Sequence, residues 1–353
     1  MRKSGLVFDN RKKELLATIV RTHVATGQPV GSFTLAEKSS EKLSSASIRN
    51  TCAELEGEGY LTHPHTSAGR VPTDKGYRYY VDNLIPAKLI SKADAARINE
   101  RLLDEETRIS PERFMERASL MLSRLSDNIG IVVSPPIARE SLKHINFVRM
   151  TDSRILVITV SSAGRVQDRI IRLDADFTQD ELNSTARYLM ENFHGWTLSE
   201  IRDELALRVK EAEALYDRFL RNAILLCTTS VEESDQPDVF IEGASNLLTK
   251  PDFGGAGSLR ALFKMLEQKS RMVKILDECL ESSHRETVAV RIGSENRLTD
   301  LRECAIIASP CFYAGGLQAA SLGVVGPTRL DYDRLIGIVD YIARLFERTL
   351  GQQ

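Results

Sequence analysis

Apolar residues recur at helical spacing in three successive stretches near the start of the chain. Residues 10–27 carry one stripe of Leu, Ile and Val, which indicates a helix that ends at Gly27 and Pro29. Residues 32–38 predict a short second helix with Ser32 as its cap. A polar turn then leads to a third helix, so the pattern favours a compact three-helix unit.

The third helix begins at a pair of serines. Ser44 or Ser45 can cap it, because a Ser side chain accepts hydrogen bonds from the unpaired N–H groups of a first turn. Gly57 and Gly59 end it. The residues spaced to form its buried face are Ile48, Cys52 and Leu55.

A short hairpin is predicted next. Residues 60–62 form its first strand, residues 65–70 a small polar turn, and Val71 begins the returning strand. A hairpin behind three helices is typical of a winged helix-turn-helix. Residues 73–84 predict a helix leaving the hairpin, and we expect its tyrosines to pack on this unit, because base stacking suits single strands.

The third helix and the hairpin carry side chains suited to reading DNA. In such units the last helix enters the major groove, where Asn pairs with adenine, Arg with guanine, and Ser with either phosphate or base. Arg70 at the hairpin tip can reach a phosphate or the minor groove. Each residue alone also fits an ordinary solvated surface, but together with the fold pattern they favour DNA binding. The candidate DNA-binding residues are Ser45, Ser47, Arg49, Asn50, His65, Thr66 and Arg70.

The rest of the chain predicts strands and helices in blocks. Residues 91–108 read as a polar connecting helix at a domain boundary, and Ser110-Pro111 begins the next helix. Two capping boxes, Thr178 with Glu181 and Thr197 with Glu200, open a helix through Phe193 and one long helix that continues to Cys227. Further helices are expected over 242–248, 258–280 and 335–350, and strands over 129–134, 145–150, 154–161, 166–173, 288–292, 305–309 and 322–325. This order favours an α+β multidomain chain in which one domain carries an insertion.

The charge is unevenly distributed. The net charge is −2, but residues 1–80 hold 12 Lys and Arg against 8 Asp and Glu. A modestly basic head on an acidic body suits a DNA reader. The five cysteines are scattered without a C-x-x-C pair, which favours buried thiols in a reducing cytosol. No signal peptide or membrane-spanning run is found, so we expect a cytoplasmic protein.

Catalytic and cofactor motifs are not found. Gly254-Gly255-Ala256-Gly257 lacks the Lys-Ser/Thr of a phosphate loop and reads as a hinge. His63 and His65 could bind a metal, but with no third ligand nearby a solvated or phosphate-facing role is favoured. We therefore expect no enzyme activity, no cofactor and no metal.

Six motifs stand out along the chain: GQPVGSFTLAEK, LSSASIRNTCAELEGEGYL, PHTSAGRVPTDKGYRYYVD, EGASNLL, IGSEN and LGVVGPTRLDYDR. In this order they resemble the motifs of HrcA, the heat-inducible transcription repressor family of bacteria. The chain departs from the family pattern at three positions: Phe33 replaces the usual Arg, Ser47 the usual Thr and Cys52 the usual Met. The change at Phe33 could remove a phosphate contact.

The resemblance implies an architecture and a function. It implies a winged helix-turn-helix over 1–88, a GAF-like domain over 89–140 and 236–353, and an inserted dimerisation domain over 141–235. It further implies a homodimer that binds an inverted-repeat operator on double-stranded DNA, called CIRCE, and represses chaperone operons until heat stress. The GroEL chaperonin is the implied partner. Two alternatives stay open: a small-molecule-responsive regulator with the GAF-like domain as sensor, and a DNA-binding scaffold without repressor activity.

The block from Ile145 to Val231 is the expected site of dimerisation. Its helix end over residues 219–226 is apolar on more than one stripe, so we expect part of it to be covered by a second copy of the chain. Leu220 and Ile224 are the residues chosen there to test a dimer contact.

Overall fold

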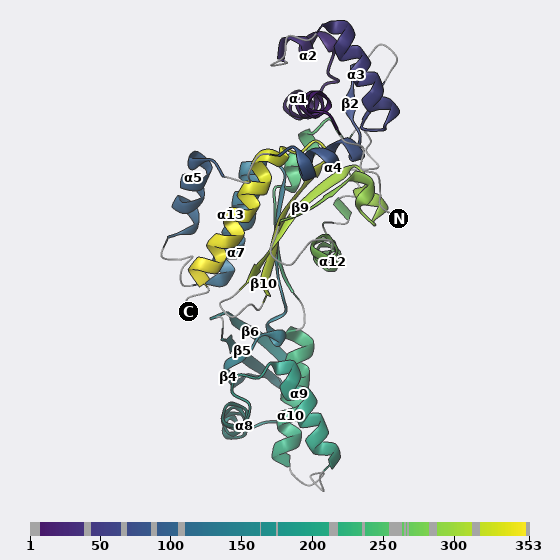
Figure 1. The fold of residues 1–353 in the computed structure, drawn as a ribbon. Helices are drawn as coiled ribbons and strands as arrows, with labels where there is room; N and C mark the ends of the chain where they lie inside the picture. Colours follow the sequence, from purple (N-terminus) through teal and green to yellow (C-terminus); the bar gives the residue numbers. More distant parts are fainter. Residues whose placement is uncertain are drawn as a thin grey trace.

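The computed structural model forms three bodies along one long axis (Figure 1). It describes residues 8–38, 44–64, 69–85, 90–104, 110–162, 164–173, 176–211, 218–234, 237–253, 263–264, 266, 268–281, 288–312 and 318–350. We call the bodies the head, the central body and the inserted body. The architecture is of the mixed α+β class that the sequence predicts.

The head contains α1 (Asn10–Thr26), α2 (Ser32–Lys38), α3 (Ser45–Gly57), β1 (Leu61–Thr62), β2 (Val71–Pro72) and α4 (Asp74–Asn83). α1 ends where Gly27 takes a left-handed φ of 67° and its N–H donates to the carbonyl of His23. Ser32 is the first residue of α2 rather than its cap. The strands pair antiparallel, with Leu61 opposite Pro72.

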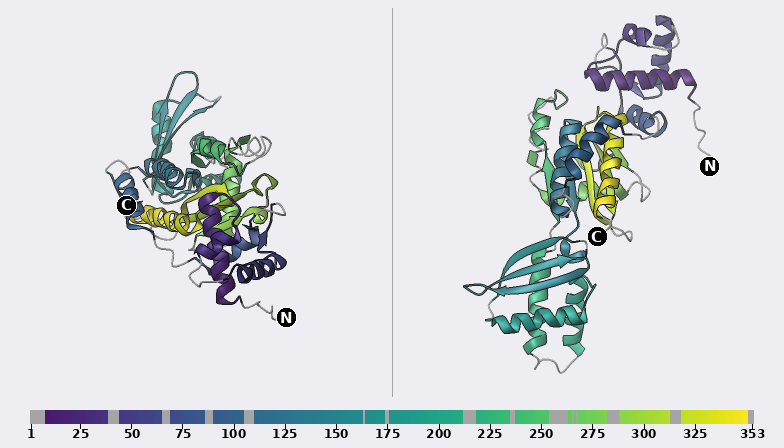
Figure 2. Two further views of the ribbon diagram at one scale, coloured as in Figure 1. Left: turned by 90° about the horizontal axis from the view of Figure 1, so that it is seen from above. Right: turned by 90° about the vertical axis from the view of Figure 1, so that its left-hand side faces the viewer.

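The central body is a five-stranded antiparallel sheet with helices on both faces. Its strands, in the order β7-β3-β10-β9-β8, are β7 (Asp238–Glu242), β3 (Ile129–Ser134), β10 (Gln318–Pro327), β9 (Cys304–Phe312) and β8 (Ala289–Ile292). One face packs on α7 (Pro111–Ser126) and α13 (Tyr332–Leu350), flanked by α5 (Lys92–Leu102), and the other on α12 (Lys269–Glu281) (Figures 1 and 2). Short 3₁₀ turns are η1 (Ile137–Arg139), η3 (Ala244–Thr249), η4 (Gly293–Glu295) and η5 (Thr299–Leu301).

The inserted body lies between β3 and β7, which are neighbours in the central sheet. It holds a separate antiparallel sheet of β4 (Leu142–Arg149), β5 (Arg154–Ser161) and β6 (Val166–Arg172). α8 (Gln179–Asn192), α9 (Leu198–Glu211) and α10 (Arg218–Ser234) share a core with one face of this sheet (Figure 2, right). Both predicted capping boxes are formed: Glu181 and Glu200 accept from the backbone N–H of Thr178 and Thr197.

Two predicted elements differ from the structure. Residues 238–242 form a strand, and the following turn is 3₁₀, where a helix over 242–248 was predicted. The long helix to Cys227 is wrong, because α9 and α10 pack against each other as two helices. The predicted connecting helix after Ser91 is α5, and it packs on the central body, since Ile98 and Leu102 are buried and α5 contacts α7 and α13. The helix expected over 258–280 corresponds to α12 at its described end, and the glycines at 254–257 lie outside the described residues.

Candidate nucleic-acid interface

Helix α3 is held from both its start and its inner face. The Ser44 hydroxyl accepts a hydrogen bond from the Ser47 N–H at 3.2 Å, so Ser44 is the cap. The predicted inner face is fully buried and consists of Ile48, Cys52 and Leu55. Burial raises the pKa of the Cys52 thiol to about 11, so this thiol is neutral and serves packing. These anchors fix the direction in which the opposite face points.

That opposite face carries the predicted DNA-reading residues of the helix. Arg49 and Asn50 are both exposed, on the first turns of α3. Ser47 is half-buried, and its hydroxyl accepts a hydrogen bond from Arg11 on α1. Ser45 is the first residue of the helix, and its side chain lies outside the described part of the chain. The exposed face is therefore formed by consecutive residues that differ in hydrogen-bonding chemistry.

Arg11 is a neighbour of this face that the sequence did not single out. It lies on α1 and reaches α3 by its contact with Ser47, 36 positions along the chain. The Arg-Lys-Lys run at 11–13 was the available signal. The charge of Lys12 beside it is already compensated by ion pairs, because its ammonium lies 2.8 Å from a carboxylate oxygen of both Glu54 and Glu58. Arg11 and Arg49 are thus the cationic groups we associate with this surface.

The hairpin places Arg70 against the head rather than away from it. The backbones of Arg70 and Val30 exchange two hydrogen bonds of 2.9 Å. The Arg70 Nε lies 3.3 Å from a Glu56 carboxylate oxygen, and His63 Nε2 lies 2.8 Å from the same oxygen. The Arg70 side chain is 19% exposed. To reach a phosphate, Arg70 must leave this ion pair. His65 and Thr66 lie outside the described residues.

Contacts from α4 fix the head on the central body. The carboxylate of Asp74 accepts a hydrogen bond of 2.8 Å from the N–H of Ser294. Tyr80 donates to Asp333 at 2.6 Å. Burial, followed by this hydrogen bond, raises the pKa of Tyr80, so its hydroxyl stays protonated. Tyr77 is also buried, with its ring centre 5.8 Å from that of Tyr332. The tyrosines were expected to pack on the head; Tyr77 and Tyr80 are buried, and these contacts join them to the central body.

The described residues offer no sign of a metal centre or a membrane span. No three His, Cys, Asp or Glu side chains in the described ranges are grouped to hold a metal ion. Among the same residues, no helix combines the length and apolar character needed to cross a bilayer.

Comparison with known proteins identifies the family. The family model described as HrcA protein C terminal domain matches residues 112–336. The heat-inducible transcription repressor HrcA of Geobacter sulfurreducens is 38% identical and covers 97% of this chain and 98% of its own. The chain belongs to the HrcA family. The HrcA repressor of Laribacter hongkongensis is 36% identical over 98% of this chain and 96% of its own.

The family assignment extends to function and fold. HrcA proteins are heat-inducible transcription repressors, a class that is generally not enzymatic. A crystal structure of a hypothetical protein at 2.2 Å resolution has the same fold, with a TM-score of 0.64 at 22% identity over 98% of this chain and 99% of that chain. The match to the family model begins after the head, but the full-length relatives include the head as well.

Proposed function

We propose that this chain represses chaperone operons by binding an inverted-repeat CIRCE operator as a homodimer until heat stress. The observation that carries this proposal is the exposed, rigidly mounted face of α3 with Arg49 and Asn50, in a chain of the HrcA family. We infer that the head, residues 1–88, is a winged helix-turn-helix whose α3 enters the major groove. The proposed location is the cytoplasm.

The residues of the head take different roles in this proposal. Asn50 pairs with adenine and Arg49 with guanine, because these side chains can make bidentate contacts to those bases. Ser47 and Arg11 contact the phosphate backbone of the DNA beside these bases, since together they place a hydroxyl and a cation at one point. Arg70 exchanges its pair with Glu56 for a phosphate. Ser45, His65 and Thr66 remain candidates for backbone contacts.

We propose that the dimer forms through the outer face of the inserted sheet. The inner face of this sheet is covered by its own helices, whereas the outer face is largely apolar and exposed. Val166, Ile170 and Val148 are 58%, 53% and 37% exposed. Three half-buried residues of β5 lie between them. The paired registers place six apolar residues on this face, Val148, Leu156, Ile158, Val160, Val166 and Ile170, together with the polar His144, Asn146 and Asp168. An apolar sheet face of this kind favours packing against a second sheet.

The end of α10 is less favourable for the dimer than the sequence suggested. Ala223, Leu226 and Cys227 are buried within the inserted body, and Ile224 packs against the same core. The side chain of Leu220 lies outside the described residues. We therefore assign the dimer contact to the sheet and keep Ile224 as a comparison.

The remaining assignments rest on the family resemblance. Residues 89–140 and 236–353 would form the GAF-like domain, and 141–235 the inserted dimerisation domain. The GroEL chaperonin would keep the repressor active. A second candidate function, a small-molecule-responsive regulator that uses the GAF-like domain as sensor, is favoured by a cavity beside β3 and β10.

The proposal is tested by a footprint of the purified full-length protein on promoters of chaperone operons, with and without GroEL. We expect protection of an inverted repeat, with two symmetric half-sites. A matched fragment with a shuffled repeat should stay unprotected at the same concentration. Protection of both fragments, or of neither, would contradict the proposal.

A further inference from the structure

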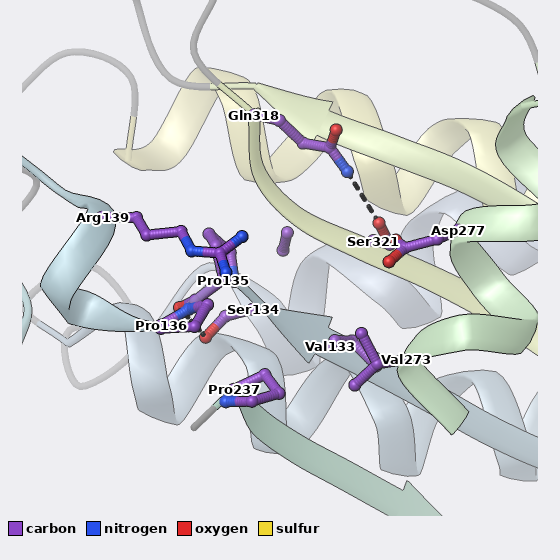
Figure 3. A pocket seen from close by; sticks show the side chains of 11 residues that line it. Val133, Ser134, Pro135, Pro136, Arg139, Pro237, Val273, Asp277, Gln318 and Ser321 are labelled. Atoms are coloured by element: carbon purple, nitrogen blue, oxygen red, sulfur yellow. Dashed lines mark hydrogen bonds between the residues drawn. The ribbon is translucent and has the colours of Figure 1, made fainter. Parts of the chain in front are cut away.

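A cavity of about 310 Å³ lies where the chain passes between the central and the inserted bodies. The chain leaves the central sheet after β3 through Pro135 and Pro136, and returns before β7 through Pro237. All three prolines line the cavity, together with residues of β3, β10 and α12 (Figure 3). The volume is at the lower end of the range for small-molecule sites. An occupant would touch both connections at once.

The mouth of the cavity carries one charge of each sign. Arg139 from η1 and Asp277 from α12 reach toward it from opposite sides (Figure 3). Both residues are exposed. Partial burial and the nearby Glu281 raise the pKa of Asp277, while Arg139 opposes the rise. The pair can therefore hold an anionic group and a cationic amino group of one ligand.

The inner wall is apolar with a few hydroxyl groups. Val133 is buried, and Val273 lies across from it on α12 (Figure 3). Ser134 and Ser321 are buried polar residues on neighbouring strands. The Ser321 hydroxyl accepts a hydrogen bond of 2.8 Å from Gln318, so its own proton can be donated to a ligand. This wall suits a short hydrocarbon chain.

The same two connections are clamped from the other side by Arg165. This residue precedes β6, and only 2% of its side chain is exposed. Its guanidinium donates to the carbonyl of Pro135 at 3.0 Å and to the carboxylate of Asp238 at 2.7 Å, and it also pairs with Glu140. Asp238 directly follows Pro237 of the cavity wall. A ligand that moves either connection must therefore change the contacts of Arg165, which hold the inserted body in place against the central body.

We propose that this cavity binds a small zwitterion of amino-acid size, with its carboxylate at Arg139, its ammonium at Asp277 and its side chain against Val133 and Val273. Binding is coupled to the placement of the inserted body through the connections that Arg165 holds. The ligand site does not depend on operator binding and gives the sensor candidate a ligand class, whereas the effect of the ligand on operator affinity rests on the proposed function.

The test adds each common L-amino acid singly, in millimolar excess, to the full-length protein and follows Tm. At least one is expected to raise Tm, because a ligand that binds only the folded state stabilises it. Calorimetry with that amino acid should then show affinity lowered by about ten- to a hundredfold in Arg139→Gln and Asp277→Asn, from the loss of a charged hydrogen bond. Arg113→Gln, on the exposed side of α7, is the matched control and should bind as the parent does.

A separate variant tests the site even if the charge variants misfold. Val273→Phe fills the cavity from α12 without touching a charge and should also abolish binding, with an unchanged circular dichroism spectrum. If no amino acid raises Tm, or if the charge and cavity variants bind like the parent, the site is wrong.

The coupling has its own readout. The amino acid should shift operator affinity of the parent protein but not of Arg139→Gln. An amino acid that binds without shifting operator affinity contradicts the coupling. A protein that binds the amino acid but no operator contradicts the proposed function and leaves the site standing.

Discussion

Arg78 and Glu295 join the head to the central body across 217 positions of sequence. The Arg78 Nε donates to Glu295 at 2.7 Å, and the same guanidinium donates to the carbonyl of Val290 at 2.7 Å. Glu295 also accepts from the N–H of Ile292, which holds its carboxylate at the turn. The pair therefore helps to hold α4, and with it the head, on the central body.

Breaking this pair should weaken operator binding more than it weakens folding. We predict that Arg78→Ala lowers the free energy of unfolding by about 1–2 kcal/mol, the worth of a partly exposed charged hydrogen bond. Operator affinity should fall further, because the two heads of the proposed dimer must meet two half-sites in fixed geometry. Chemical denaturation and fluorescence anisotropy measure the two effects. Arg113→Ala removes an exposed pair of 3.7 Å on α7 and should change neither.

The pair of Asp94 and Arg334 should make stability depend on pH. Arg334 donates to both carboxylate oxygens of Asp94, at 2.8 and 2.9 Å, and this lowers the pKa of Asp94 below its ordinary 3.8. A lowered pKa stabilises the fold above the unfolded-state value, and this stability is lost as the pH falls through the folded value. Asp94→Asn should thus destabilise by about 1–2 kcal/mol near neutral pH.

The measurement is urea unfolding of the parent protein and Asp94→Asn at neutral pH and near pH 3. The difference in unfolding free energy between the two proteins should shrink in acid. A difference that stays constant over this range would show that Asp94 contributes by packing and not by its charge.

The proposed dimer surface predicts a monomeric variant. Ile170→Glu places a charge in the largely apolar contact and should give a folded monomer with weak operator binding, as seen by sedimentation. Glu191→Ala, an exposed position on α8, which covers the inner face of the sheet, is the surface control. Ile224→Glu should instead lower stability, because Ile224 packs against the core of its own body. A dimeric Ile170→Glu protein would move the contact elsewhere.

Arg70 tests the role of the hairpin. If Arg70 leaves Glu56 to meet a phosphate, Arg70→Ala should lower the slope of log affinity against log salt by about one, with sequence preference unchanged. Glu56→Gln, which frees Arg70 without removing it, should keep the slope and strengthen binding slightly. An unchanged slope in Arg70→Ala means that the guanidinium stays in the head.

The head could be predicted from local pattern, whereas its attachments could not. A serine cap and the inner face of α3 follow from residue types at fixed spacing, although the choice of Ser44 over Ser45 came only from the structure. The partners Arg78 and Glu295 are set only by packing of distant elements. Likewise, Arg70 reads as an exposed turn residue until the fold brings Glu56 beside it.

The missed strand β7 has a similar reason. Residues 238–242 are short, end in a Glu, and lie at the edge of the sheet, so their strand character comes from pairing with β3. The break between α9 and α10 was hidden by an apolar pattern that continues through both helices, since two packed helices and one long helix share the same periodicity.

The central claim is that α3 reads base sequence, and Asn50 tests it most directly. Fluorescence anisotropy of full-length protein should compare the parent, Asn50→Ala and the control Asn83→Ala, whose side chain bonds only within α4 among the described residues. We predict that Asn50→Ala loses about 1–3 kcal/mol on the operator and little on shuffled DNA, with Asn83→Ala unchanged on both. Equal losses on the two DNAs, or no loss on the operator, would contradict the account.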